Sequence, residues 1–511
     1  MRLTTRLLAS TTLAFLATQA VALTGEEVWA NQTAYLSGLG ITVSQTQTRA
    51  GNVLTVSDIA YDLTFPFAVG RLSLRSGPQT YAENADGSVD VGYAPVNTLA
   101  LYASIIPGPG DALFMAANLT VATQGQTMKA TGTADDITYD SRADLMEITL
   151  SDVLLSGESE LESVSLDAYL SIEDSVTTVR ITTGAATTLT GTSVSGRTVS
   201  DVGISIGEEM QSKTVSLQLS TNVAYSLTLP AAPMDLMDMS QALRDGLAIT
   251  MEVWTGAGQS QAVTMAFGTI ISDQSSTVDS SRTRFRLDGQ GIGVSGQADQ
   301  AVISLEATDE LPLKIDASLG GLTFEFAFPL NSSTAPVEAV YAFGVTDLAL
   351  TDDLWAKIDG TGAFPRQPLS FALDLRSNVT LKTDLLDIAG LQVMIEAGLM
   401  PFDIQSVRIG NLSVNAAGAS AVASGEFTLD MTDLDSFDGF PRPTGSATAT
   451  VIGANALLDS LLQAGWVSAD DLTAARLAMS MFATSTGDDQ LQSTLEINAE
   501  GHVIANGQRI Q

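Results

Sequence analysis

The chain has 511 residues, no cysteine, and 58 acidic against 23 basic side chains, which gives a formal net charge of −35 at pH 7. The absence of cysteine excludes disulfides, thiolate metal sites and cysteine nucleophiles, and the negative charge disfavours nucleic acid and anionic lipid head groups as partners. Only 6% of the residues are aromatic, so we expect a large core built mainly from aliphatic side chains.

Residues 1–22 have the pattern of a secretory signal peptide. Arg2 and Arg6 precede a mostly apolar stretch, residues 7–16, and Ala20-Val21-Ala22 is a small-x-small cleavage site. The apolar stretch is shorter than the ~20 residues that a membrane-spanning helix needs. We therefore expect cleavage at the end of this segment, export to the periplasm, and no transmembrane helix in the mature chain.

The first elements of the mature chain are one helix and a series of strands. Thr24 and Glu27 form a capping-box pattern that starts the helix, and the glycines after residue 37 end it. Asp86-Gly87 predicts the turn of a hairpin. Alternation of apolar and polar residues then predicts further strands at 59–65, 148–150 and 164–172.

The clearest periodicity lies between Val215 and Trp254. Apolar residues, with Thr221 among them, occupy every second position from Val215 to Leu229, which predicts one half-buried strand roughly 50 Å long at about 3.3 Å per residue. Two prolines end this strand. Residues 234–247 change to the period of an amphipathic helix, and residues 247–253 return to alternation. A long strand, a short helix and a long strand form a unit that recurs later in the chain.

The C-terminal region repeats this strand–helix pattern. A short helix is expected over residues 350–358, a rigid elbow at Phe364-Pro365-Arg366-Gln367-Pro368, and an amphipathic helix closed near Gly465. Ser468 and Asp471 form a second capping box. Asn506-Gly507 predicts a tight turn near the end. We expect the apolar side of the helix pair to close the core against a terminal sheet, through Leu457, Leu461, Leu472, Met479 and Phe482.

Together these patterns predict a mostly β protein of the α+β class. We expect long, antiparallel, curved sheets with a few short amphipathic helices. No linker is long enough to force separate domains, so the division is a loose one, into a sheet-rich half at 23–247 and a second at 248–511 that ends in the helix pair and a hairpin.

The chain resembles a family of Gram-negative envelope proteins, domain of unknown function 2125. The similarity rests on the helix that carries Trp29, on residues 83–91 around Asp86-Gly87, on residues 354–375 around the elbow, and on residues 453–507. Gln367 stands where the family pattern has an acidic residue. The helix-then-strand ending is also similar to AsmA-like envelope proteins, which implies a lipid-binding β-groove. The resemblance implies no catalytic residue.

Two sequence motifs have a functional and a structural interpretation. Gly291-Ile292-Gly293-Val294-Ser295-Gly296 matches a dinucleotide-binding fingerprint, but the residues that follow it continue as strand, so we interpret it as a turn or bulge. The aspartates at 430, 433, 435 and 438 offer oxygen ligands without the spacing of a calcium loop, and we interpret them as an acidic loop. The looser group at 135, 136, 140 and 144 is interpreted in the same way.

No catalytic constellation is evident. His502 is the single histidine, which excludes a zinc site with two histidines, and no nucleophile elbow accompanies it. With 58 acidic residues, a pair of carboxylates suited to glycoside hydrolysis stays an open alternative. A sugar site usually needs aromatic side chains, and the chain has only four tryptophans. We predict a non-enzymatic protein without cofactor or metal.

The sequence suggests a ligand-binding surface instead. The apolar face of the 215–229 strand and the adaptable methionines after it could form the wall for a lipid or another apolar ligand. The predicted wall residues are Leu217, Leu219, Val223, Tyr225, Leu227, Met234, Met237 and Met251. Two alternatives stay open: a structural or interaction protein whose apolar face is sealed by a second sheet, and an outer-membrane β-barrel, although the chain end lacks the usual aromatic residue.

Overall fold

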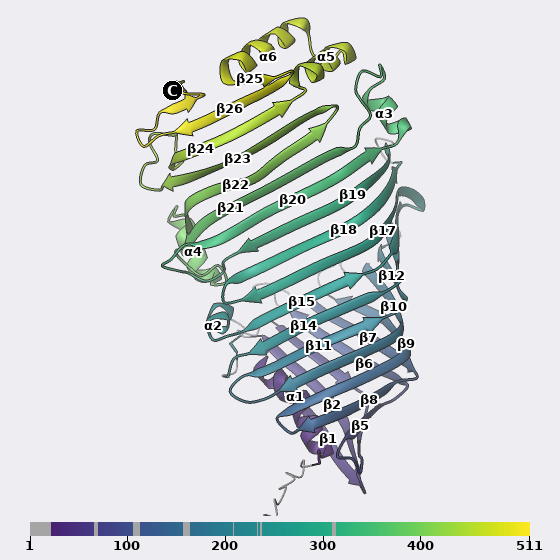
Figure 1. The fold of residues 1–511 in the computed structure, drawn as a ribbon. Coiled ribbons are helices and arrows are strands. Elements are labelled where there is room, and N and C mark those ends of the chain that lie inside the picture. Colours follow the sequence, from purple (N-terminus) through teal and green to yellow (C-terminus); the bar gives the residue numbers. More distant parts are fainter. Residues whose placement is uncertain are drawn as a thin grey trace, which may run out of the picture.

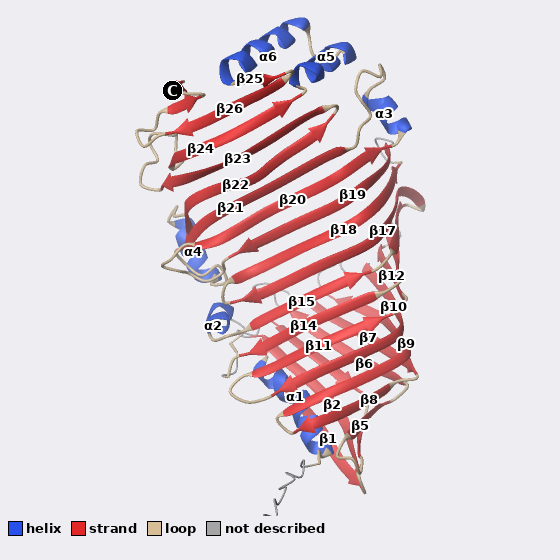
Figure 2. Ribbon diagram, viewed as in Figure 1, coloured by secondary structure: helices blue, strands red, loops and turns tan. Residues whose placement is uncertain are grey.

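The computed structural model describes residues 22–65, 70–105, 113–156, 164–207, 209–231, 234–235, 238–308 and 313–510. Strands make up 64% and helices 13% of the structure. All strands belong to one antiparallel sheet, and the helices lie at its margins or inside its narrow end (Figures 1 and 2). The predicted fold class is confirmed. The proposed leader lies outside the described residues except for Ala22.

The N-terminal part consists of one helix, α1 (Gly25–Gly38), and fourteen strands. The strands are β1 (Thr42–Ala50), β2 (Val53–Phe65), β3 (Gly70–Ser76), β4 (Gln79–Glu83), β5 (Val89–Tyr93), β6 (Val96–Ile105), β7 (Leu113–Gln124), β8 (Thr127–Thr133), β9 (Asp136–Ser156), β10 (Val164–Thr182), β11 (Thr187–Ser195), β12 (Thr198–Ile206), β13 (Met210–Gln218) and β14 (Thr221–Leu229).

The remaining strands continue the same sheet toward the C-terminus. They are β15 (Ala248–Thr255), β16 (Gly258–Ala266), β17 (Thr269–Asp288), β18 (Gly291–Ala307), β19 (Leu313–Phe328), β20 (Val337–Leu350), β21 (Leu369–Leu381), β22 (Phe402–Ala416), β23 (Ala419–Asp430), β24 (Arg442–Ile452), β25 (Thr484–Gly487), β26 (Gln490–Ile497), β27 (Val503–Ala505) and β28 (Gln508–Arg509). The helices between them are α2 (Met239–Arg244), α3 (Asp352–Ile358), α4 (Ile388–Glu396), α5 (Ala454–Ala464) and α6 (Ala469–Phe482).

A crease runs across the sheet from β2 to β20. Strands β2, β10, β18 and β20 cross it with one residue in the left-handed conformation, at Asp58, Asp174, Gln300 and Asp347, with φ of 52°, 51°, 51° and 52°. Other strands break there, and the crease separates β3 from β4, β5 from β6, β7 from β8, β11 from β12, β13 from β14, and β15 from β16. Figure 1 shows the sheet turning back on itself along this line.

The crease divides the folded part of the sheet into two walls. The α1-side wall contains β4, β5, β8, β11, β14 and β15. The opposite wall contains β3, β6, β7, β12, β13 and β16. The long strands β2, β9, β10, β17, β18, β19 and β20 belong to both walls. We call the space between the walls the trough.

The extra residue at the crease reverses which side chains face the trough. In β10, Val179 and Ile181 face the trough on one side of Asp174, whereas Leu170 and Ile172 face it on the other. One unpaired residue shifts a period-two pattern by one position. Each wall therefore keeps its own alternation. In β10 the inward positions of the opposite wall are apolar, whereas in β13 they are Ser212, Thr214 and Ser216.

The prediction of one uninterrupted strand at 215–229 is wrong, because the crease crosses this segment. The segment forms two strands, β13 and β14, separated at Leu219-Ser220. Leu219 N still donates to Ala257 O at 2.9 Å, so the break is aligned with the one between β15 and β16. The alternation in the sequence continues through the break, but the backbone changes direction there, so the apolar stripe lies on two different faces.

The expected helix at 234–247 is shorter than predicted. Only Met239–Arg244 is helical, capped by the Asp238 side chain, which accepts from Gln241 N. Leu243 and Leu247 are buried with Leu229 in a small core cluster. The sheet is not interrupted at 247/248, because β14 pairs with β15 across this point.

Several other local predictions are confirmed. Thr24 and Glu27 form the capping box of α1, Ser468 and Asp471 form that of α6, and the Asp86-Gly87 turn joins β4 to β5. Asn506 and Gly507, both with positive φ, form the turn between β27 and β28. Helix α5 ends at Gly465 in the left-handed conformation.

The C-terminal helix pair packs less completely than predicted. Leu472 is buried and Leu457, Leu461 and Met479 are half-buried, but Phe482 is 43% exposed. The pair lies at the end of the sheet (Figure 1), and α5 contacts β23. Ser493 Oγ donates to Phe482 O at 2.6 Å. The five predicted residues therefore do not form a sealed core at this end.

Candidate ligand trough

The inner face of the trough is apolar along the α1-side wall. Directly paired residues of neighbouring antiparallel strands point to the same face of a sheet. The inner row can therefore be followed from strand to strand: Leu189, Leu227, Ile249, Leu287, Ile292 and Phe328 form one row, and Tyr225, Met251, Phe285, Val294, Phe326, Tyr341 and Leu375 form the next. Both rows cross from the N-terminal into the C-terminal part of the sheet.

The outer face of the same wall is polar and carries ion pairs. Arg282 and Arg284 both contact Glu252. Arg376 binds Glu338 at 3.2 Å and Asp374 at 3.0 Å. These pairs are partly exposed to solvent, and such pairs contribute little to stability. Their position shows that polar and apolar side chains are separated between the two faces.

Helix α1 fills the trough at its N-terminal end. Val28 and Trp29 are buried against Leu54, Tyr81 and Ile137, together with other residues of the α1-side wall. Asn31 Nδ2 donates to Ile181 O at 3.3 Å, and Tyr139 Oη donates to Asn31 Oδ1 at 2.9 Å. These buried bonds fix the helix on the wall, and the packed core beneath it ends the trough on this side.

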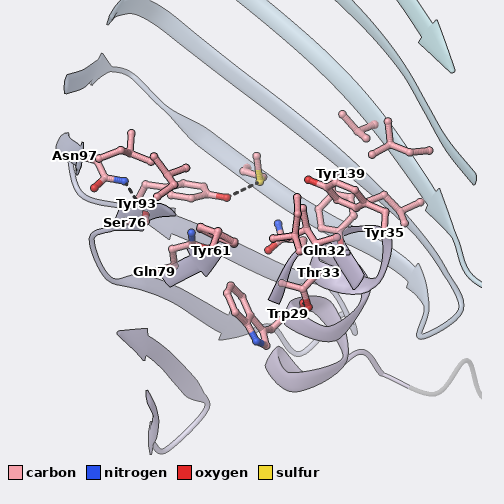
Figure 3. Close-up of a pocket in the computed structure, with 18 of the residues that line it drawn as sticks. Trp29, Gln32, Thr33, Tyr35, Tyr61, Ser76, Gln79, Tyr93, Asn97 and Tyr139 are labelled. Atoms are coloured by element: carbon pink, nitrogen blue, oxygen red, sulfur yellow. Dashed lines mark hydrogen bonds between the residues drawn. The ribbon is translucent and has the colours of Figure 1, made fainter. Parts of the chain in front are cut away.

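A cavity of about 630 Å³ lies between α1 and the two walls. Figure 3 shows side chains of α1 and of strands from both walls around it. Its aliphatic lining includes Leu63, Leu72, Leu74 and Leu99 from the opposite wall, and Val179, Ile181 and Leu189 from the α1-side wall. None of the described residues that line it is charged. The volume is that of a small-molecule site.

The polar groups around the cavity bond mainly to each other. Tyr81 Oη lies 2.7 Å from the side-chain oxygens of both Gln32 and Gln79. Asn97 Oδ1 accepts from Gly77 N at 3.0 Å, and its amide lies 3.4 Å from Ser76 Oγ. With these partners satisfied inside the protein, the surface presented to a ligand consists mainly of hydrocarbon and ring faces.

The tyrosines near the cavity are held neutral. Burial raises the pKa of Tyr93 to about 12. Burial also raises the pKa values of Tyr35, Tyr61 and Tyr139. Desolvation disfavours the charged form of a phenol, so this end of the trough is a poor environment for any charge.

Glycines on the inner face make room for aromatic rings. Tyr225 lies over Gly191, and a methyl group added at Gly191 would lie 2.3 Å from Tyr225 Cζ. Phe324 lies in the same way over Gly296, with a corresponding distance of 2.5 Å. The rings lie across the neighbouring strand, which keeps the inner face smooth.

A second apolar depression lies farther along the same inner face. Its volume is about 520 Å³, and its lining includes Val294, Phe326, Tyr341, Leu375 and Phe402. Tyr341 is 51% exposed and Phe326 38% exposed. The lining runs from β18 to β22, so the depression extends past β20 into the part of the sheet that has a single wall.

The predicted wall residues do not all lie together. Val223, Tyr225, Leu227 and Met251 share the inner face of β14 and β15. Leu217 lies on the outer face of β13, because its neighbour Ser216 pairs with Ser200, which pairs with Leu170. Leu219 is 55% exposed at the crease. Met234 packs against the small core cluster around Leu229, and Met237 lies outside the described residues.

Most of the cavity lining was missed by the sequence reasoning. Tyr35, Tyr61, Tyr93, Tyr139 and Gln79 come from separate, individually unremarkable elements. Two signals could have identified part of the set. The capping box places Trp29 and Gln32 on a helix near the start, and the apolar positions change from even to odd numbers around Asp174, which indicates a bend.

The other candidate sites have structural roles. Residues 291–296 form the start of β18 rather than a helix N-terminus. Arg442 binds Asp430 at 3.0 Å and Asp433 at 3.1 Å, so two of the four carboxylates of this acidic loop share a cation from the same chain. His502 lies in the turn after β26, where its backbone N–H donates to Asn498 Oδ1. Within the described part of the chain, no group of three or more potential metal ligands comes together.

Comparison of the chain with protein-family models, curated proteins and solved structures finds no match. The similarity to domain of unknown function 2125 therefore stays a prediction. None of the helices in the described ranges has the length and apolar character required to cross a membrane.

Proposed function

We propose that this protein is a non-enzymatic, exported envelope protein that binds the acyl chains of a lipid along the inner face of the trough. The observation that supports this proposal is the continuous apolar row that includes Tyr225, Met251, Phe285 and Phe326. Met251 is 44% exposed although its neighbours on the inner face are apolar. Covering such a surface with hydrocarbon gains about 25 cal/mol per Å².

The cavity under α1 adds a second line of support. Its mostly aliphatic and aromatic lining and its volume of about 630 Å³ are typical of sites for apolar ligands. The proposed location, the periplasm, rests on the leader pattern of residues 1–22.

The test compares two glutamate substitutions at adjacent positions. Met251 faces the trough, and the exposed Thr250 faces outward on the same strand. We expect Met251→Glu to weaken binding of a fluorescent fatty acid by at least tenfold, because a carboxylate would be desolvated by the chain. Thr250→Glu should bind as the unchanged protein does, since its side chain stays in water.

Circular dichroism of both variants controls for folding. Equal binding by the two variants would contradict the proposal. No binding by the unchanged protein would favour a structural or interaction protein instead.

A further inference from the structure

The cavity under α1 differs from the rest of the trough in having walls on both sides and an end. It is bounded by α1, by the α1-side wall through Tyr139 and Leu189, and by the opposite wall through Leu74 and Leu99. Beyond the cavity the core is packed, since Val28, Leu54 and Val56 are buried there. A ligand that lies in the trough can therefore enter the cavity with only one of its ends.

The lining of the cavity determines which end that is. No charged side chain is among the described residues that line it. The side-chain oxygens of Gln32 and Gln79 lie within hydrogen-bond distance of Tyr81 Oη. Asn97 accepts from Gly77 N, and its amide N–H donates to Ser76 Oγ. Burial of a carboxylate or phosphate without a partner costs several kcal/mol or more, whereas hydrocarbon gains free energy by leaving water.

We infer that the cavity is a terminal site for the methyl end of an acyl chain, so that the lipid lies in the trough with its charged head group directed away from α1. This inference rests on the proposed function, because it assigns a direction to the chain bound in the same trough. The ligand class is a single-chain or multi-chain lipid with a saturated or unsaturated hydrocarbon tail, rather than a ligand recognised by its head group.

Trp29 provides a reporter inside the site. Its indole lines the cavity and packs edge-on against Tyr81 at 6.2 Å between ring centroids. The other tryptophans lie elsewhere. Trp254 packs against Arg282, Trp355 belongs to α3, and Trp466 packs against Phe364. None of these three lines the cavity.

The experiment uses two brominated fatty acids of equal length, because bromine quenches a nearby indole. One carries bromine on the terminal carbon and the other on the carbon next to the carboxylate. In the full chain with Trp254, Trp355 and Trp466 replaced by phenylalanine, we expect the terminally brominated acid to cause a loss of Trp29 emission and the other to cause none.

If the triple variant does not fold, quenching by the two brominated acids is compared between the unchanged protein and Trp29→Phe. The terminally brominated acid should then quench the unchanged protein more than Trp29→Phe. Quenching by the carboxylate-proximal bromine that equals or exceeds that of the terminal bromine would overturn the inference. Binding of both acids without any quenching of Trp29 would also overturn it, and both outcomes would leave the trough as a lipid site.

Failure of both acids to bind would contradict the proposed function itself, which separates the two claims.

A further variant, Leu99→Phe, narrows the cavity. It should shift the preference toward shorter acyl chains, whereas Leu154→Phe, on the outer face and 67% exposed, should not. An unchanged chain-length preference in Leu99→Phe would contradict the terminal site.

Discussion

Gly191 and Tyr225 face each other on neighbouring strands of the α1-side wall. The pair shows how a small residue shapes the inner face, because the ring of Tyr225 occupies the space that a side chain at Gly191 would fill. The φ angle at Gly191 is not positive, so the backbone conformation does not require glycine there. Glycine is required because the ring of Tyr225 occupies the space of a side chain.

We therefore expect Gly191→Ala to destabilise the protein by about 1–3 kcal/mol, the usual cost of overpacking. The added methyl group lies 2.3 Å from Tyr225 Cζ, so the ring must move into the trough. Gly203→Ala is the matched control, because no atom lies within 4 Å of the added methyl. Urea unfolding measures both variants, and equal free energies of unfolding would contradict the packing argument.

The buried tyrosines predict a loss of stability at alkaline pH. The pKa of Tyr93 is raised by burial from 10.0 to about 12. Between these values the folded chain holds a proton that the unfolded chain releases, so stability is complete below pH 10 and falls as the pH rises toward 12. Tyr81 and Tyr139, whose pKa values are also raised by burial, act in the same direction.

Replacing Tyr93 by phenylalanine should reduce this alkaline loss. The measurement is the free energy of unfolding of the unchanged protein and of Tyr93→Phe in urea, from pH 8 to pH 11. Tyr102→Phe, at a residue that is 51% exposed, should leave the slope as it is. A slope that is unaffected by Tyr93→Phe would show that this phenol does not contribute.

At the scale of the elements, the crease is the feature on which the shape depends. A non-glycine residue in the left-handed conformation is strained by about 1 kcal/mol or more. Gln300 in β18 has φ of 51° and is exposed, and Asp279 and Gly320 lie opposite it in β17 and β19 without pairing.

We expect Gln300→Gly to be neutral or stabilising by up to about 1 kcal/mol, because glycine adopts this conformation without strain. Gln300→Val should be destabilising, since a β-branched side chain is particularly unfavourable there. Gln297→Val is the matched control, because this exposed residue pairs regularly with Arg282 and Thr323 in the same strand. If thermal unfolding shows the same effect at both positions, the strain is not located at the crease.

The element scale also marks the limit of the sequence reasoning. Alternation and turn residues were sufficient to predict many of the strands, the helix after Thr24 and the hairpin at Asp86-Gly87. They were not sufficient at Leu219-Ser220, where the alternation continues but the backbone turns. The sequence shows only which positions are polar and which are apolar. The face of the sheet on which a side chain lies also depends on whether an unpaired residue separates the two strands.

The candidate site could be predicted only in part for the same reason. Tyr225, Leu227 and Met251 belong to neighbouring strands and were recognised through their local pattern. The cavity, in contrast, brings together α1, β2, β5 and β9, and such long-range pairing is set by the topology of the whole sheet. No local pattern links Trp29 with Leu99.

At the scale of the whole molecule, the trough has one narrow end and one open end. The two walls face each other from β2 to β20, and beyond β20 the sheet continues as a single layer to the C-terminus (Figure 1). The inner row stays apolar through this change, from Leu375 to Ile409. An acyl chain could therefore lie on a surface that is half-enclosed near α1 and open toward the second depression around Phe326.

The most direct test of this account places a photo-crosslinking amino acid at adjacent positions of one strand. Benzoylphenylalanine at Met251 faces the trough, and at Thr250 it faces outward. After illumination with a fatty acid or phospholipid, mass spectrometry should detect a protein–lipid adduct for position 251 and none for position 250. Equal adducts at both positions, or an adduct at 250 alone, would contradict the claim that lipid binds the inner face.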